Sequence, residues 1–136
     1  MRLLISTLAL FALTAADTPA ASIEGHWRSP GGNSIILIGP CGATLCGKIE
    51  WASEKAKQDS RKTVGDQLVG AQLLTNLTQD KKGNWQGKLF IPDKNMRVTA
   101  KIQLVSPQQL RVSGCAVGKA MCKAAVWTRT DGTLPS

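Results

Sequence analysis

The sequence contains no tyrosine, only two phenylalanines and a single histidine. Side chains that commonly serve in acid–base catalysis and in stacking against nucleic-acid bases are therefore scarce. With His26 as the only histidine, general acid–base catalysis would depend on it or on a carboxylate. His26 alternates with Trp27 and should therefore lie on the outer side of its strand. The chain has no Gly-rich phosphate loop, no HExxH motif and no CxxC motif. We expect no catalytic residues, no cofactor and no metal, and a protein that is not an enzyme. The alternative is an enzyme without a recognisable motif, which a pH–rate profile tied to His26 or a carboxylate would reveal.

Exposed aromatic side chains for stacking nucleic-acid bases are also scarce. Besides the two phenylalanines there are four tryptophans, and these fall mostly on the apolar phase of their segments. Binding of single-stranded nucleic acid needs a basic groove lined with exposed aromatic rings. We therefore expect no nucleic-acid partner.

Long hydrophobic runs are missing except near the start of the chain. Arg2 precedes an almost unbroken apolar run over residues 3–12, and small residues follow at 14–16. This order is typical of a cleavable export signal, and the run is shorter than the roughly 20 residues that span a bilayer. We predict a signal peptide over residues 1–16, with cleavage after Ala20 or Ala21 as the alternative. The expected remainder is a flexible lead-in at 17–22, one domain at 23–130 and a flexible tail at 131–136, without an integral membrane segment after cleavage.

The four cysteines, an even count in a small exported chain, predict disulfides. Three pairings are available, and we favour Cys41–Cys46 with Cys115–Cys122 because each pair brackets a turn and can meet across a hairpin. The alternative is a structural zinc site of four thiolates. Ligand pairs in such sites are usually separated by two to four residues, whereas the gaps here are four and six in an oxidising compartment.

Alternation of apolar and polar residues dominates the chain after residue 23, which predicts β-strands with one packed face and one solvated face. The expected strands are 23–28, 34–38, 47–51, 72–77, 85–89, 98–104, 110–114 and 124–130. Turn residues separate them, so we predict an all-β fold, a small antiparallel up-and-down barrel of about eight strands. A two-sheet β-sandwich is the alternative.

One polar, charged segment at 53–69 interrupts the alternation. Residues 54–57 within it can form a helical turn. The segment is either a functional loop or a disordered linker, because long loops inside small domains are often functional.

The sequence Gly25-His26-Trp27 near the start is matched by Trp127-Thr128-Arg129 near the end. In a closed barrel the first and last strands are neighbours, so the Arg129 guanidinium can lie over the Trp27 indole in a cation–π contact. This pairing resembles the lipocalin and fatty-acid-binding-protein superfamily, in which it closes one barrel end.

A wider resemblance covers most of the chain. It is carried by Gly25-His26-Trp27-Arg28, by the segments at 41–49, 68–74, 85–93 and 111–115, and by Cys122 with the Trp127-Thr128-Arg129 stretch. These segments are similar to the exported bacterial family called domain of unknown function 2147. The resemblance implies a lipocalin-like barrel, periplasmic or secreted, and no established activity. Many members carry an Asp-X-X-Asn-Pro-like loop, of which this chain keeps Asp59 but not the Asn-Pro.

We therefore predict a periplasmic or secreted binding protein for a small apolar or amphipathic ligand. Trp51, Trp85 and the 53–69 segment are expected at the barrel opening, with basic side chains attracting an anionic headgroup. Trp27 and Arg129 are candidate ligand contacts as well as barrel-closing residues. The sequence leaves the ligand and the oligomeric state open.

The alternative is an envelope interaction or inhibitor protein that acts through its basic surface or the 53–69 segment. Lysine and arginine number 17 against 9 acidic residues, a net charge of +8 that attracts anions or serves solubility alone. The cations look spread along the chain. Binding to a polyanion should weaken steeply with salt, whereas binding in an apolar pocket should not.

Overall fold

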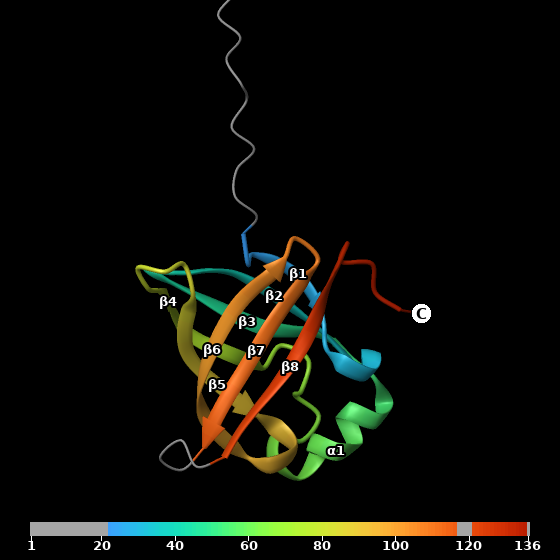
Figure 1. Ribbon diagram of the computed structural model, residues 1–136. Coiled ribbons are helices and arrows are strands. Elements are labelled where there is room, and N and C mark those ends of the chain that lie inside the picture. Colours follow the sequence, from blue (N-terminus) through green and yellow to red (C-terminus); the bar gives the residue numbers. More distant parts are fainter. Residues whose placement is uncertain (1–21, 117–120, 136) are drawn as a thin grey trace, which may run out of the picture.

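Antiparallel strands paired in chain order form a closed barrel (Figure 1). The computed structural model describes residues 22–116 and 121–135, so the expected signal peptide lies outside the described residues. Within them the strands are β1 (Gly25–Arg28), β2 (Ser34–Cys41), β3 (Thr44–Ala52), β4 (Gln72–Gln79), β5 (Trp85–Ile91), β6 (Met96–Ser106), β7 (Gln109–Ala116) and β8 (Met121–Thr130). All eight strands predicted from alternation are present. Pairing of β1 with β8 closes the barrel and excludes the sandwich.

Alternation places the apolar residues of each strand inside the barrel. On β6, Val98, Ala100 and Ile102 are buried, while the residues between them are exposed. The inward side chains of the other strands pack with Ala100 and Ile102 in one core. Its members are Ile23, Trp27, Ile36, Ile38, Ile49, Ala52, Leu68, Leu73, Leu74, Leu77, Ala100, Ile102, Leu110, Val112 and Trp127.

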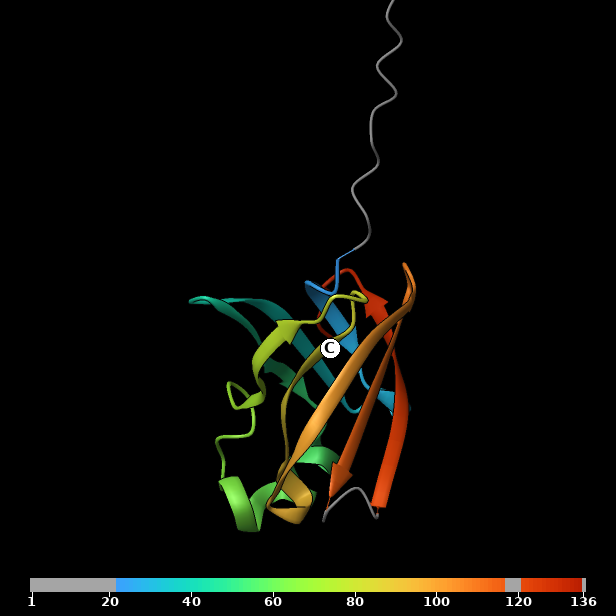
Figure 2. The ribbon, with the colours of Figure 1, turned by 60° about the vertical axis from the view of Figure 1, so that its left-hand side comes forward.

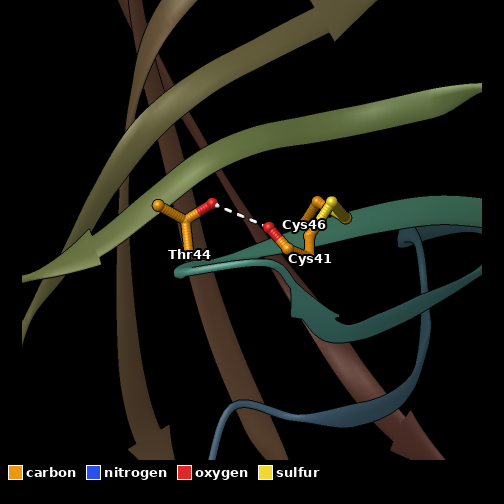
Figure 3. The surroundings of a disulfide bond; sticks show 3 residues. All are labelled: Cys41, Thr44 and Cys46. Carbon is orange, nitrogen blue, oxygen red and sulfur yellow. Dashed lines mark hydrogen bonds between the residues drawn. A yellow bond between two sulfur atoms is a disulfide. The ribbon is translucent and has the colours of Figure 1, made fainter.

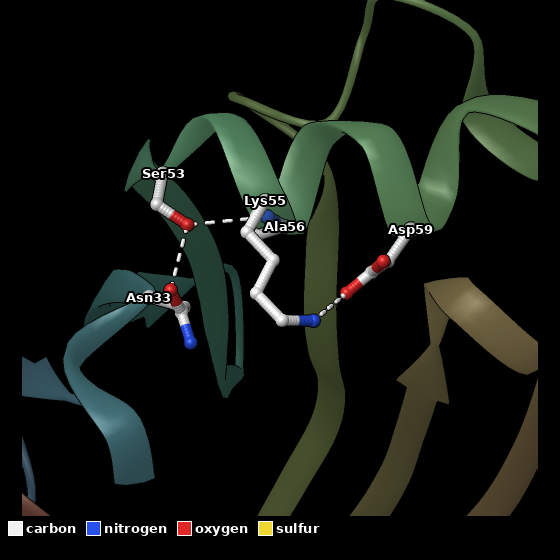
Figure 4. A network of polar contacts seen from close by, with 5 residues as sticks. All are labelled: Asn33, Ser53, Lys55, Ala56 and Asp59. Atoms are coloured by element: carbon white, nitrogen blue, oxygen red, sulfur yellow. Dashed lines mark hydrogen bonds and ion pairs between the residues drawn. The ribbon is translucent and has the colours of Figure 1, made fainter.

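The 53–69 segment forms a helix, α1 (Glu54–Val64), which includes the helical turn expected at 54–57 and corrects the expectation of a long loop or a disordered linker. The Ser53 hydroxyl accepts a hydrogen bond from the Ala56 N–H at 3.1 Å and donates one to Asn33 Oδ1 at 2.8 Å (Figure 4). A serine in this position caps a free N–H of the first turn. The helix lies at one end of the barrel and contacts the short 3-10 turn η2 (Pro92–Lys94) (Figure 2).

Two disulfides join neighbouring strands, as the preferred pairing predicted. Cys41–Cys46 braces the β2–β3 hairpin, in which the Thr44 hydroxyl also donates to the Cys41 carbonyl at 3.4 Å (Figure 3). Cys115–Cys122 joins β7 to β8. With all four sulfur atoms bonded in this way, the zinc alternative is wrong.

The described residues, 22–116 and 121–135, lack two features that are found in other proteins. They contain no helix with the length and apolar character needed to cross a bilayer. In the same part of the chain, no group of three or more histidine, cysteine or acidic residues could hold a metal ion.

Candidate functional site

One end of the barrel is held shut by Arg129 on β8. Its guanidinium carbon lies 4.3 Å from the centroid of the Trp27 ring, the cation–π contact that the sequence predicted. Its N–H groups donate to three backbone carbonyls, those of Glu24 at 2.9 Å, Ser22 at 2.5 Å and Pro107 at 2.8 Å. One side chain therefore ties the segment before β1 to the turn between β6 and β7.

Gly25 and Trp27 on β1 contribute to the same closed end of the barrel as Arg129 on β8. Gly25 has a φ of 123°, and a Cβ atom there would lie 2.8 Å from a terminal nitrogen of Arg129, so only glycine admits the guanidinium. Trp27 is completely buried, and its indole N–H donates to the Ile23 carbonyl at 2.8 Å. The glycine and tryptophan thus form one unit with Arg129.

The opposite end of β8 borders an apolar pocket of about 400 Å³. The pocket lies between the later part of β5, the start of β6, the later part of β7 and the start of β8, with η2 at its edge. Its lining residues are Leu89, Ile91, Lys94, Met96, Val98, Val112, Gly114, Lys123, Ala124, Ala125 and Trp127. Two of them, Lys94 and Lys123, are cationic, and no carboxylate is among the described residues that line the pocket.

Strand phase explains why a lysine reaches this pocket. Trp127 is buried, and successive side chains of a strand point to opposite faces, so Ala125 and Lys123 share the inner phase of Trp127. Lys123 is paired with Gly114, and Ala125 with Val112. The small residues Gly114 and Ala125 leave space where larger side chains would fill the barrel.

The candidate ligand residues from the sequence do not gather around this pocket. Trp27 and Arg129 lie at the closed end. Trp85 borders a separate depression of about 310 Å³ between the β2–β3 hairpin and the β4–β5 connection. Trp51 is half-buried on β3 and lines neither cavity. The tryptophan that lines the larger pocket is Trp127.

The sequence predicted basic side chains at the opening but did not identify them as Lys94 and Lys123. The sequence did contain a signal for the position of Lys123. Lys123 precedes Ala125 by two residues and the core residue Trp127 by four, so all three side chains lie on the same face of the strand. Lys94 follows the Pro92 turn, and its place at the pocket edge depends on how η2 folds back. The 53–69 segment reaches this end of the barrel indirectly, through the contact of α1 with η2.

The only histidine lies on the barrel wall, away from the pocket lining. His26 Nε2 and Glu50 Oε2 are 2.8 Å apart, and both side chains are about 30% exposed, at 30% and 28%. Gly132 packs against the ring, since a Cβ there would lie 2.9 Å from the imidazole. Neither His26 nor Glu50 lines the pocket.

The closed eight-strand antiparallel barrel, which carries an arginine–tryptophan contact at one end, is a lipocalin-like fold. The solved structure titled "Protein HP1028 from the human pathogen Helicobacter pylori belongs to the lipocalin family" is similar to it, with a TM-score of 0.64 and 12% identity over 83% of this chain and 86% of that one. At this identity the likeness concerns the fold.

The chain belongs to the family described as "Uncharacterized protein conserved in bacteria (DUF2147)", whose model matches residues 25–129. The match confirms the resemblance noted in the sequence. No curated protein matches the chain in sequence. The two disulfides and the bacterial family are consistent with an exported protein.

Proposed function

We propose that this protein binds a small amphipathic anion in the pocket of about 400 Å³ lined by Trp127, which we call the mouth pocket. The apolar part of the ligand would lie in this pocket and its acidic group beside Lys94 and Lys123. The observation that carries the proposal is an apolar cavity whose charged lining residues are two lysines. Its volume of about 400 Å³ lies within the range of small-molecule sites. The proposed role is binding without catalysis, in the periplasm or in the secreted medium.

The two parts of the ligand contribute differently to affinity. Lys94 and Lys123 are solvent-exposed, and exposed ion pairs contribute only about 0–1 kcal/mol each. Removal of apolar surface from water contributes about 25 cal/mol per Å², so an acyl chain or ring system supplies most of the binding free energy. A small inorganic anion should therefore bind much more weakly than an amphipathic one.

The first prediction concerns the two lysines. We expect decanoate to bind more tightly than the neutral 1-decanol, because only decanoate has a charge for the lysines to attract. Lys94→Gln with Lys123→Gln should weaken decanoate binding about tenfold, from two exposed pairs, and leave 1-decanol binding unchanged. Isothermal titration calorimetry measures both. The control, Lys48→Gln with Lys62→Gln, removes the same charge from β3 and α1 and should have no effect.

A pocket-filling substitution tests the location of the site. Ala125→Phe puts a ring inside the cavity and should abolish the binding of both probes, whereas Val126→Phe puts the same ring on the outer face of β8. Circular dichroism checks that each variant is folded. Decanoate binding that survives Ala125→Phe in a folded protein would show that the pocket is not the site. Native mass spectrometry of protein purified without detergent would reveal a natural ligand as extra mass lost on denaturation.

A further inference from the structure

Charge is divided unevenly between the two halves of the barrel. Residues 22–80 contain six cationic and six anionic side chains, whereas residues 81–130 contain ten cationic side chains and one anionic, Asp93. The basic residues looked dispersed in the sequence, but six of the seven acidic residues within 22–130 lie in the first half. The strands β5 to β8 therefore contain no acidic residue.

The strand register gathers part of this charge on the outer wall. Lys101 on β6 is paired with Gln86 on β5 and with Ser113 on β7. Lys88 and Arg111 each lie two residues from these partners, so they share the outer face and are diagonal neighbours of Lys101. All three side chains are exposed. We call Lys88, Lys101 and Arg111 the basic row.

The basic row has no carboxylate partner. In the part of the chain that the structure describes, the ion pairs involve His26, Lys55, Lys57 and Arg61, all outside β5 to β8. The Lys88 ammonium donates to the Thr99 hydroxyl at 3.2 Å, which leaves its charge uncompensated. A row of unpaired cations is suited to an extended anionic surface.

Apolar side chains accompany the charges on this wall. Val105 is 58% exposed on β6, and Val126 is 46% exposed on β8, where it is paired with Arg111. Towards the pocket end, the Arg97 guanidinium lies 4.7 Å from the centroid of the Phe90 ring. A base would need an open aromatic face for stacking, and Arg97 already covers this one. Mixed basic and apolar side chains are typical of lipid-headgroup contacts.

We propose that the outer wall of β5 to β8 docks on an anionic lipid surface through the basic row. The inference rests on the charge and register of the wall and holds whether or not the mouth pocket binds a ligand. Arg97, next to Phe90 on this wall, lies at the same end of the barrel as Lys94 and Lys123. Docking in this way would place the pocket opening beside the lipid headgroups.

Cosedimentation with lipid vesicles tests the docking. Exported protein, its N-terminus identified by intact mass, is mixed with phosphatidylcholine vesicles that either contain or lack phosphatidylglycerol. We expect binding only with phosphatidylglycerol and a steep loss with added salt, because the Debye length is about 10 Å at 0.1 M salt. Lys88→Gln, Lys101→Gln and Arg111→Gln together should weaken binding on the order of 100-fold, since each charge near an anionic surface contributes about fivefold.

The matched control is Lys48→Gln, Arg61→Gln and Lys62→Gln, which removes the same charge from exposed positions outside the wall. It should retain binding to within a few-fold. Equal loss in both triple variants would show attraction by net charge alone and overturn the proposal. So would an absence of vesicle binding, or binding of double-stranded DNA with the same dependence on the basic row. Decanoate affinity is measured on the same samples, so a failure of the pocket proposal is recorded separately.

Discussion

Arg129 is the residue on which closure of the barrel depends most. Its fork of N–H groups holds three carbonyls while its plane covers Trp27. Arg129→Lys keeps the charge but loses the fork, because an ammonium group is a compact point charge. We expect the free energy of unfolding to fall by about 2 kcal/mol from lost hydrogen bonds and ring contact. Urea unfolding measures this free energy. Arg111→Lys on the outer wall is the control, and it should change the free energy of unfolding by less than about 0.5 kcal/mol. Equal effects would contradict a special role for Arg129.

At the same scale, the sequence predicts residues that act through strand order and misses those that act through loop geometry. Trp27 and Arg129 could be paired in advance because the first and last strands of a closed barrel must be neighbours. Lys123 could have been placed on the inward-facing side of β8 by its phase with Trp127. Lys94 could not, since its position depends on the backbone after Pro92, where no periodicity applies. Trp51 and Trp85 were predicted as aromatic residues on the inward phase of their strands, and strand phase does not indicate which end of the barrel a residue lies near.

At the scale of elements, all eight strands were predictable but their ends were not. The expected strand at 47–51 extends over Thr44–Ala52 because its first residues pair with β2 as far as Cys41. Alternation reports which face a residue takes, whereas strand length depends on the partner. The sequence did not predict helix α1 beyond its first turn, because the helix has no apolar residue at its buried position. That position is occupied by Ser60. The available signals were the capping residues Ser53 and Gly65.

The two disulfides give a prediction about the elements they join. Each closes a short loop, with sequence separations of 5 and 7, so replacing either pair by alanine should lower the free energy of unfolding by about 2 kcal/mol. Their effects on ligand binding should differ. Cys115–Cys122 adjoins Gly114 and Lys123 in the pocket lining, whereas Cys41–Cys46 lies outside it. Decanoate titration should show weakened binding only without Cys115–Cys122. Equal affinities in the two variants would show that the β7–β8 bridge does not shape the pocket.

The molecule as a whole combines an electrically neutral first half, residues 22–80, with a second half, residues 81–130, that supplies the positive net charge. Such a distribution has an energetic consequence, because like charges on neighbouring strands repel one another when the barrel folds. Pairing with carboxylates would relieve the repulsion, but β5 to β8 contain none. The basic row should therefore lower the stability of the free protein.

Salt and substitution together measure this cost. At low ionic strength, Lys88→Gln, Lys101→Gln and Arg111→Gln together should raise the free energy of unfolding by about 1 kcal/mol, a few tenths for each charge. Calorimetry should show this as a rise of about 3 °C in Tm, and the rise should shrink as salt screens the repulsion. The triple variant at Lys48, Arg61 and Lys62 should give no rise, because the acidic residues all lie in its half apart from Asp93 and the terminal Asp17 and Asp131. If the basic row destabilises the free protein but strengthens its contact with anionic vesicles, the role of the row is in binding and not in folding. If removing it lowered Tm instead, the row would have a structural role, and repulsion would not be the dominant interaction among its charges.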